Sequence, residues 1–131
     1  MRSYSYEEAV ALLPEVIPVV ESLRDAYIEL RAIQASVAVH SRGASGDGHL
    51  LANPWSEDDG ENRLEELNRQ IRQAVGTLDR WSIEVKDPEK GLIDFFHERE
   101  GRTVYLCFHL GESAIGYWHE LNTGFAGRQP I

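Results

Sequence analysis

The alternation of apolar and polar residues in the last third of the chain most constrains its fold. Residues 82–87, 91–96 and 103–110 alternate in this way and are rich in β-branched and aromatic side chains, as half-buried strands are. If the two hairpins close in their simplest registers, one face receives seven apolar side chains from the three strands. These are Ile83, Val85, Ile93, Phe95, Val104, Leu106 and Phe108. Because a slip of one residue would move a strand's apolar set to the other face, this agreement predicts an antiparallel β-meander.

The region before residue 82 has a helical period instead. Ser5 and Glu8 form a capping box at the start of the first helix. Pro14 and Pro18 each lack an amide donor, so we expect a short first turn or a kink there and regular helix from about Pro18. Two apolar stripes at three- and four-residue spacing predict an antiparallel helical hairpin over residues 5–81. The stripes are Val20, Leu23, Tyr27, Leu30 and Val37, and Leu64, Leu67, Ile71, Ala74, Leu78 and Trp81.

The segment between the stripes, residues 41–60, sustains neither period and is rich in Gly, Ser and Asp. We expect it to be a mobile loop. A chain of 131 residues can bury its own core, so we expect a single domain, residues 1–131. The expected fold class is α+β, with an antiparallel two-helix hairpin (5–81) packed on a three- to four-stranded antiparallel β-meander. The meander and a C-terminal tail occupy residues 82–131.

The charge of the chain limits its partners. A formal net charge of −9 and a pI near 4.9 argue against binding to nucleic acid and to anionic membrane surfaces, which both need clustered Lys and Arg. Metal cations, small molecules and protein partners remain compatible with this charge. The single cysteine, Cys107, excludes an internal disulfide and fits a reducing compartment. With no signal peptide or membrane-length apolar stretch in the sequence, we expect a cytoplasmic protein.

The polar face of the predicted sheet contains an unfavourable pair of like charges. Glu84 and Asp94 would be cross-strand neighbours, which destabilises a sheet. Lys86, a bound cation or a raised carboxyl pKa would offset the repulsion. Residues 115–120 can add a fourth strand, and a three-residue loop before it would place His119 beside Tyr105 on the Asp94 face. A loop that differs by one residue would reverse this placement, so the sequence leaves the register open.

A divalent metal site is the most specific functional hypothesis for this face. Asp94, Glu112 and His119 would be the ligands, with Glu84 or His109 as additional candidates. Imidazole combined with carboxylates suits zinc, nickel, iron or manganese. The alternative is that His119 is a hydrogen-bonded histidine at the sheet edge.

Three further residues have a functional and a structural interpretation. Tyr105 and Arg128 are candidate ligand-binding residues. Gly124 and Gly127 allow tight backbone turns near Arg128, whose guanidinium could bind a carboxylate or a phosphate. Arg128 could equally hold the C-terminal tail by pairing with an acidic residue. Cys107 would be a reactive thiol if His109 acted as its base, whereas a buried cysteine is the structural interpretation. No complete set of nucleophile, base and orienting residue is visible, which favours binding over catalysis.

Several motifs resemble a known family. GLIDF, VYLCF, LGE, WHE and GFAGRQP, together with YEEAVALLPEV and IEVKD, are similar to the bacterial "domain of unknown function 2203" family. The resemblance covers nearly the whole chain outside residues 41–60. Phe96 stands where the family has proline and Phe108 where it typically has tryptophan, and we interpret both as packing differences. The resemblance implies a small cytosolic bacterial domain and no particular activity.

The function expected from the sequence is therefore the binding of a divalent metal or small ligand on the polar face of the sheet. The alternative is a non-catalytic assembly or protein-interaction module that forms a homo-oligomer. Trp55, Trp118 and Phe125 are candidate contact residues for such an assembly, since aromatic side chains are enriched at interfaces. For Trp118 we favour packing in the core.

Overall fold

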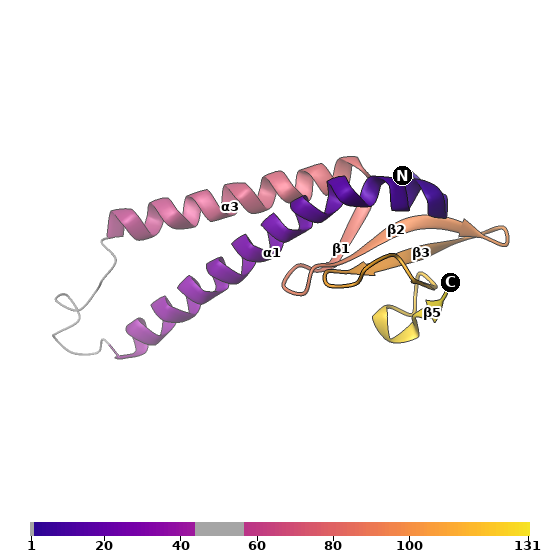
Figure 1. The fold of residues 1–131 in the computed structure, drawn as a ribbon. Coiled ribbons are helices and arrows are strands. Elements are labelled where there is room, and N and C mark those ends of the chain that lie inside the picture. The colour runs from indigo at the N-terminus through magenta and orange to yellow at the C-terminus, as the bar shows by residue number, and fades with distance from the viewer. Residues whose placement is uncertain (1, 44–56) are drawn as a thin grey trace.

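The structure is a computed structural model that describes residues 2–43 and 57–131, with side chains for residues 2–36 and 61–131. Within these described residues, two helices are followed by five strands (Figure 1). The elements are α1 (Tyr6–Gly43), α3 (Glu57–Arg80), β1 (Ile83–Asp87), β2 (Leu92–Arg99), β3 (Arg102–His109), β4 (Tyr117–His119), a 3-10 turn (Phe125–Gly127) and β5 (Gln129–Pro130). The expected α+β class is confirmed, and the sheet has one strand more than the upper expectation of four.

The sheet is an antiparallel meander in the order β1-β2-β3-β4-β5. Ile83 pairs with Phe95 and Phe95 pairs with Leu106, so the expected registers of both hairpins are confirmed. Tyr105 pairs with His119 across β3 and β4, which decides the register that the sequence left open. The additional strand, β5, is only two residues long, too short for an alternating pattern to reveal it.

The apolar face of the sheet and the two helices form one core. Figure 1 shows α1 and α3 on one side of the sheet and the C-terminal residues on the other. The buried core residues from the helices are Ala9, Leu13, Val16, Val20, Leu23, Ala74 and Leu78. Those from the sheet and its connections include Ile83, Ile93, Phe95, Val104, Leu106, Phe108, Ile115 and Trp118. Burial of each large apolar side chain contributes about 1.5–3 kcal/mol to the free energy of unfolding. Trp118 belongs to this core, as expected from the sequence.

The start of α1 follows the sequence pattern, but its prolines do not. Glu8 N–H donates to Ser5 Oγ at 3.1 Å and Ser5 N–H donates to Glu8 Oε1 at 2.8 Å, which confirms the capping box. The helix then continues through Pro14 and Pro18 without interruption, so the expectation of regular helix only from about Pro18 is wrong. Both prolines are exposed, and water can therefore bind the carbonyls that lack an amide donor, while the opposite face of α1 stays packed on the core.

The expected loop 41–60 is shorter at both ends, because α1 reaches Gly43 and α3 begins at Glu57. The remainder of that prediction concerns residues 44–56, which lie outside the described part of the chain. Among the described helices, no stretch combines the length and the apolarity that crossing a bilayer requires.

Candidate metal centre

Three adjacent strands bring an aspartate, a cysteine and a histidine together on the sheet face away from the helices. Asp94 of β2 pairs directly with Cys107 of β3. His119 lies on β4, opposite Tyr105, and its ring reaches across β3 to the Asp94 carboxyl. One ligand atom from each of Asp94, Cys107 and His119 lies within 4.8 Å of the other two. We call these residues the Asp–Cys–His cluster.

The cluster is enclosed by the rest of the protein. The exposed fraction is 1% for Asp94, 0% for Cys107 and 2% for His119. The Tyr105 ring packs against the His119 ring, with 5.2 Å between centroids. Polar side chains so deeply buried require partners, because an unpaired polar group costs free energy in a low-dielectric interior.

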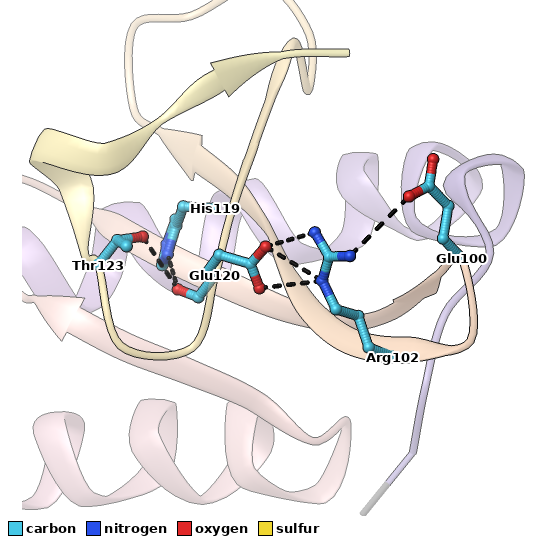
Figure 2. Close-up of polar contacts among 5 residues, drawn as sticks. All are labelled: Glu100, Arg102, His119, Glu120 and Thr123. Atoms are coloured by element: carbon cyan, nitrogen blue, oxygen red, sulfur yellow. Dashed lines mark hydrogen bonds and ion pairs between the residues drawn. The ribbon is translucent and has the colours of Figure 1, made fainter.

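The two ring nitrogens of His119 have different partners. Nδ1 lies 2.8 Å from the carbonyl oxygen of Glu120, a contact that Figure 2 shows. Because a carbonyl oxygen only accepts, Nδ1 must carry a proton. Nε2 lies 3.0 Å from Asp94 Oδ2, and this short contact requires a single proton between the two atoms. The Glu120 carbonyl thereby holds the proton on Nδ1 and orients the ring so that Nε2 faces the cluster.

The Asp94 carboxyl is only half satisfied. Its Oδ2 contacts His119, while Oδ1 has no hydrogen-bond partner among the described residues. Burial raises the pKa of Asp94 above its ordinary value of 3.8, and His119, with smaller contributions from the Cys107 thiol and Lys86, offsets only part of this effect. A buried acceptor without a partner costs about 1–3 kcal/mol. A cation bound at Oδ1 would remove this cost.

The Cys107 thiol is protonated at neutral pH. Burial, reinforced by the neighbouring Asp94 carboxylate, raises its pKa to about 12. An activated nucleophile needs the opposite shift, so the structure argues against the reactive-thiol hypothesis. A metal ion would lower this pKa, because a coordinating thiol loses its proton outright.

The like charges expected at Glu84 and Asp94 are indeed adjacent, because the two residues pair across β1 and β2. Lys86 Nζ lies 2.5 Å from Glu84 Oε2, and Tyr105 Oη donates to the same oxygen at 2.9 Å. Two of the three expected offsets are therefore present, namely the Lys86 cation and the raised pKa of Asp94. Tyr105, predicted as a ligand-binding residue, has its hydroxyl bonded to Glu84 and its ring packed at a tilted angle against the His119 ring.

Glu112 lies outside the Asp–Cys–His cluster, although the sequence predicted it as a metal ligand. Its two carboxylate oxygens accept from Arg128 Nη2 at 2.8 and 2.7 Å, and Oε1 also accepts from the His109 amide at 2.7 Å. Arg128 was predicted as a ligand-binding residue, with pairing to an acidic residue as its structural interpretation. The structure shows that pairing.

The spacing of the three ligand atoms is somewhat wider than the spacing that zinc and similar ions require. With metal–ligand distances of about 2.0–2.3 Å and tetrahedral angles, ligand atoms on one zinc lie roughly 3.3–3.6 Å apart. The cluster atoms lie within 4.8 Å of one another, so side-chain adjustments of about 1 Å would complete the geometry. The bond from His119 Nδ1 to the Glu120 carbonyl also resembles the outer support that metal-bound histidines usually have.

Sequence reasoning identified Asp94 and His119 but placed Cys107 among the reactive-thiol candidates. The signal was present, because the predicted registers already put Cys107 on the polar face with Asp94. Glu112 was chosen because carboxylates are common ligands. Its pairing with Arg128 depends on how the C-terminal residues fold back, which the local sequence pattern does not reveal.

The fold and the cluster define a class: a small α+β protein in which a helical pair covers one face of an antiparallel meander and a buried Asp–Cys–His cluster lies on the other. The family described as "Uncharacterized conserved protein (DUF2203)" has a sequence model that matches residues 2–131. The chain belongs to this family, which confirms the resemblance seen in its motifs. No curated protein and no solved structure matches it.

Proposed function

We propose that the protein binds a divalent transition-metal ion through Asp94, Cys107 and His119. One observation carries the proposal: three different ligand types converge within 4.8 Å in a buried site, where Asp94 Oδ1 has no hydrogen-bond partner in the part of the chain that the structure describes. A carboxylate, an imidazole and a thiolate form a donor set that suits zinc, iron, nickel or cobalt better than magnesium or calcium, which prefer oxygen ligands alone. Three protein ligands leave a fourth position for water or another small donor.

Binding would exchange protons for the ion. The proton between His119 Nε2 and Asp94 Oδ2 and the proton of the Cys107 thiol would both leave, because metal ligands must be deprotonated. The bound ion would then link β2, β3 and β4. Since β4 is only three residues long, this link would stabilise the edge of the sheet to which β5 is attached.

The proposal concerns binding and not catalysis. The three side chains are at most 2% exposed, so a substrate would reach the ion only after the covering residues moved. A site with three protein ligands leaves one coordination position free, as catalytic sites do, but in this protein the burial of all three ligands closes that position to a substrate.

Isothermal titration of the metal-free protein with Zn²⁺ tests the proposal. We expect a stoichiometry of about one ion per chain and greater resistance to unfolding, by about 2.7 kcal/mol when the free ion is at one hundred times its Kd. With Co²⁺, an absorption band from thiolate coordination should appear. Failure of the wild-type protein to bind Zn²⁺ and Co²⁺ would refute the proposal.

Three variants identify the ligands. Cys107→Ser should remove the Co²⁺–thiolate band, and His119→Gln should weaken binding by at least about tenfold. The matched control is His97→Gln, because the His97 ring lies on the same sheet but is bonded to the Tyr4 carbonyl at 2.7 Å. Equal loss of affinity in the His97 and His119 variants would show that binding does not require the cluster. Glu112→Gln should still bind about one ion per chain. This result would distinguish the ligand set with Cys107 from the set with Glu112 that the sequence predicted.

The alternative function is that of an assembly module. It remains a prediction, and one structural observation supports it. Several of the exposed large apolar residues lie between 117 and 131, where the exposed fractions are 38% for Tyr117, 50% for Phe125 and 52% for Ile131. Exposed apolar groups of this kind often mark contact surfaces. Light scattering on the metal-free and metal-loaded protein tests the prediction, and a strict monomer in both states would exclude it.

A further inference from the structure

Residues 121–131, which we call the C-terminal strap, fold back on the sheet face that carries the Asp–Cys–His cluster. Figure 1 shows this segment on the side of the sheet away from α1 and α3. The strap returns to the sheet through β5, which pairs with β4, and through Arg128, which pairs with Glu112 just beyond β3. Over this face the Arg128 guanidinium lies on the ring of Tyr117, the cross-strand partner of Cys107, and the Phe125 ring lies 6.2 Å from the His109 ring. The strap therefore forms part of the cover over the cluster.

Little burial holds the strap in place. Residues 121–126 and 129–131 are exposed, and only Gly127 and Arg128 are partly buried. The backbone attachment consists of the two-residue strand β5 and a bond of 3.0 Å from the Ile131 amide to the Gly116 carbonyl. Segments with few buried apolar contacts open locally at a small free-energy cost. The strap should therefore open without unfolding of the helix-covered core.

One side chain, Arg128, makes the strap's main contact with the sheet. Its guanidinium pairs with Glu112 and lies 4.1 Å from the Tyr117 ring centroid and 4.7 Å from that of Phe125. Only 13% of the Arg128 side chain is exposed. Charge-assisted hydrogen bonds in such partly dry surroundings are stronger than those of exposed ion pairs. The Glu112 carboxylate is itself fixed by the His109 amide at the end of β3.

The border of the cluster opposite the strap is formed by residues of the strands β1 and β3, which are fixed more firmly than the strap. Tyr105 is only 6% exposed, and its hydroxyl is bonded to Glu84, which pairs with Lys86. These residues belong to β1 and β3, whose registers are fixed by the core. Movement on this border would disturb the central strands of the sheet, whereas movement of the strap would break only the pairing of the two-residue strand β5 with β4.

We propose that the C-terminal strap is a closure over the metal site, held shut by the contact of Arg128 with Glu112, and that small solutes reach the cluster when the strap opens. This inference rests on the proposed function in one respect, because it takes the solute that enters to be the metal ion. The closure itself can be tested without metal, because Cys107 is the only cysteine of the chain and reports directly on access.

The experiment measures how fast a thiol reagent labels Cys107 in the native, metal-free protein. Arg128→Ala should raise the labelling rate constant by at least about tenfold, which corresponds to about 1.4 kcal/mol in the opening equilibrium. Arg63→Ala is the matched control, because Arg63 pairs through Nε and Nη2 with the Glu29 carboxylate between the two helices. This control removes the same kind of ion pair far from the strap. Once the rates are compared at equal free energy of unfolding, it should change the labelling rate constant by less than about twofold.

Two results would overturn the closure. If labelling in both variants rises in proportion to their loss of global stability, measured by urea unfolding, access occurs through global unfolding. If Arg128→Ala labels no faster than the wild-type protein, the strap does not limit access. Glu112→Gln provides a second variant in case Arg128→Ala folds poorly, since it weakens the same contact and keeps an acceptor for the His109 amide; it should also label faster.

A parallel measurement separates the closure from the metal proposal. The rate of Co²⁺ binding, followed by thiolate absorption, should increase in Arg128→Ala together with the labelling rate. Faster labelling without Co²⁺ binding in either protein would support the closure and refute the metal function. Co²⁺ binding with unchanged labelling and binding rates would support the metal function and refute the closure.

Discussion

Asp94→Asn should stabilise the metal-free protein at neutral pH while removing metal binding. The Asp94 carboxyl is buried, one of its oxygens has no partner, and burial raises its pKa despite the contact with His119. A raised pKa means that the folded state disfavours the carboxylate relative to the neutral acid. Asparagine has nearly the same shape, is always neutral, and can donate its amide proton to His119 Nε2.

The magnitude follows from two opposing effects. The substitution exchanges an unsatisfied buried carboxylate oxygen, which costs about 1–3 kcal/mol, for an uncharged amide oxygen that is less costly to bury. It also exchanges a charge-assisted hydrogen bond of about 1.5–3 kcal/mol for a neutral one of about 0.5–1.5 kcal/mol. Because burial is the largest cause of the upward pKa shift of Asp94, the first effect should win. We expect a net gain on the order of 1 kcal/mol in the free energy of unfolding.

The gain should depend on pH with a definite sign. In the unfolded chain Asp94 titrates near 3.8, and in the folded protein its pKa is higher. The stability associated with the protonated carboxyl is complete below the unfolded pKa and is lost as pH rises through the folded pKa. The advantage of the asparagine variant should therefore grow from about pH 4 upward and then level off.

Urea unfolding with a chelator present, at about pH 4.5 and about pH 7.5, measures both effects. Asp79→Asn is the matched control, because Asp79 is an exposed aspartate near the end of α3. If the Asp94 variant is less stable than the wild-type protein by more than about 1 kcal/mol at the higher pH, the carboxylate is a net stabilising partner of His119. Burial of the unsatisfied oxygen would then not be a net cost to the folded protein.

Three other substitutions test the fold through the same urea assay. Gly91→Ala should lose about 1–3 kcal/mol, because φ is +67° and a Cβ would lie 2.3 Å from Leu110 Cδ1; a neutral result would contradict the packing of this turn. Glu100→Asn should gain about 0.5–1 kcal/mol, since Glu100 has φ 54° in a two-residue hairpin turn whose type favours asparagine; a loss would contradict that turn geometry. Pro14→Ala should gain about 1–3 kcal/mol by restoring an amide donor inside α1, and a loss would mean that the proline has a packing role.

Much of the candidate site was predictable because strand periodicity fixes the direction of side chains. The registers that place Ile93 and Phe95 toward the helices necessarily place Asp94 on the opposite face. Direct pairing of Asp94 with Cys107 follows from the same registers. The convergence of these two residues was therefore contained in the pattern of the β-hairpins.

The sequence by itself determined the fold class, the capping of α1, the registers of the first two hairpins and the division of the sheet into two faces. These features follow from local rules, because helical and strand periods and turn residues act over a few positions. The same local rules misjudged Pro14 and Pro18, since the packing of the opposite helix face outweighs two lost hydrogen bonds.

Only the tertiary structure decided the position of His119, the partner of Glu112 and the enclosure of the Asp–Cys–His cluster. Each depends on the path of the chain after β3, where β4 and β5 are three and two residues long. Segments so short have almost no periodic signal, and contacts with the rest of the sheet set their position. The contact of Arg128 with Glu112 holds the Glu112 carboxylate away from the cluster. The third residue of the cluster is therefore Cys107 and not the expected Glu112.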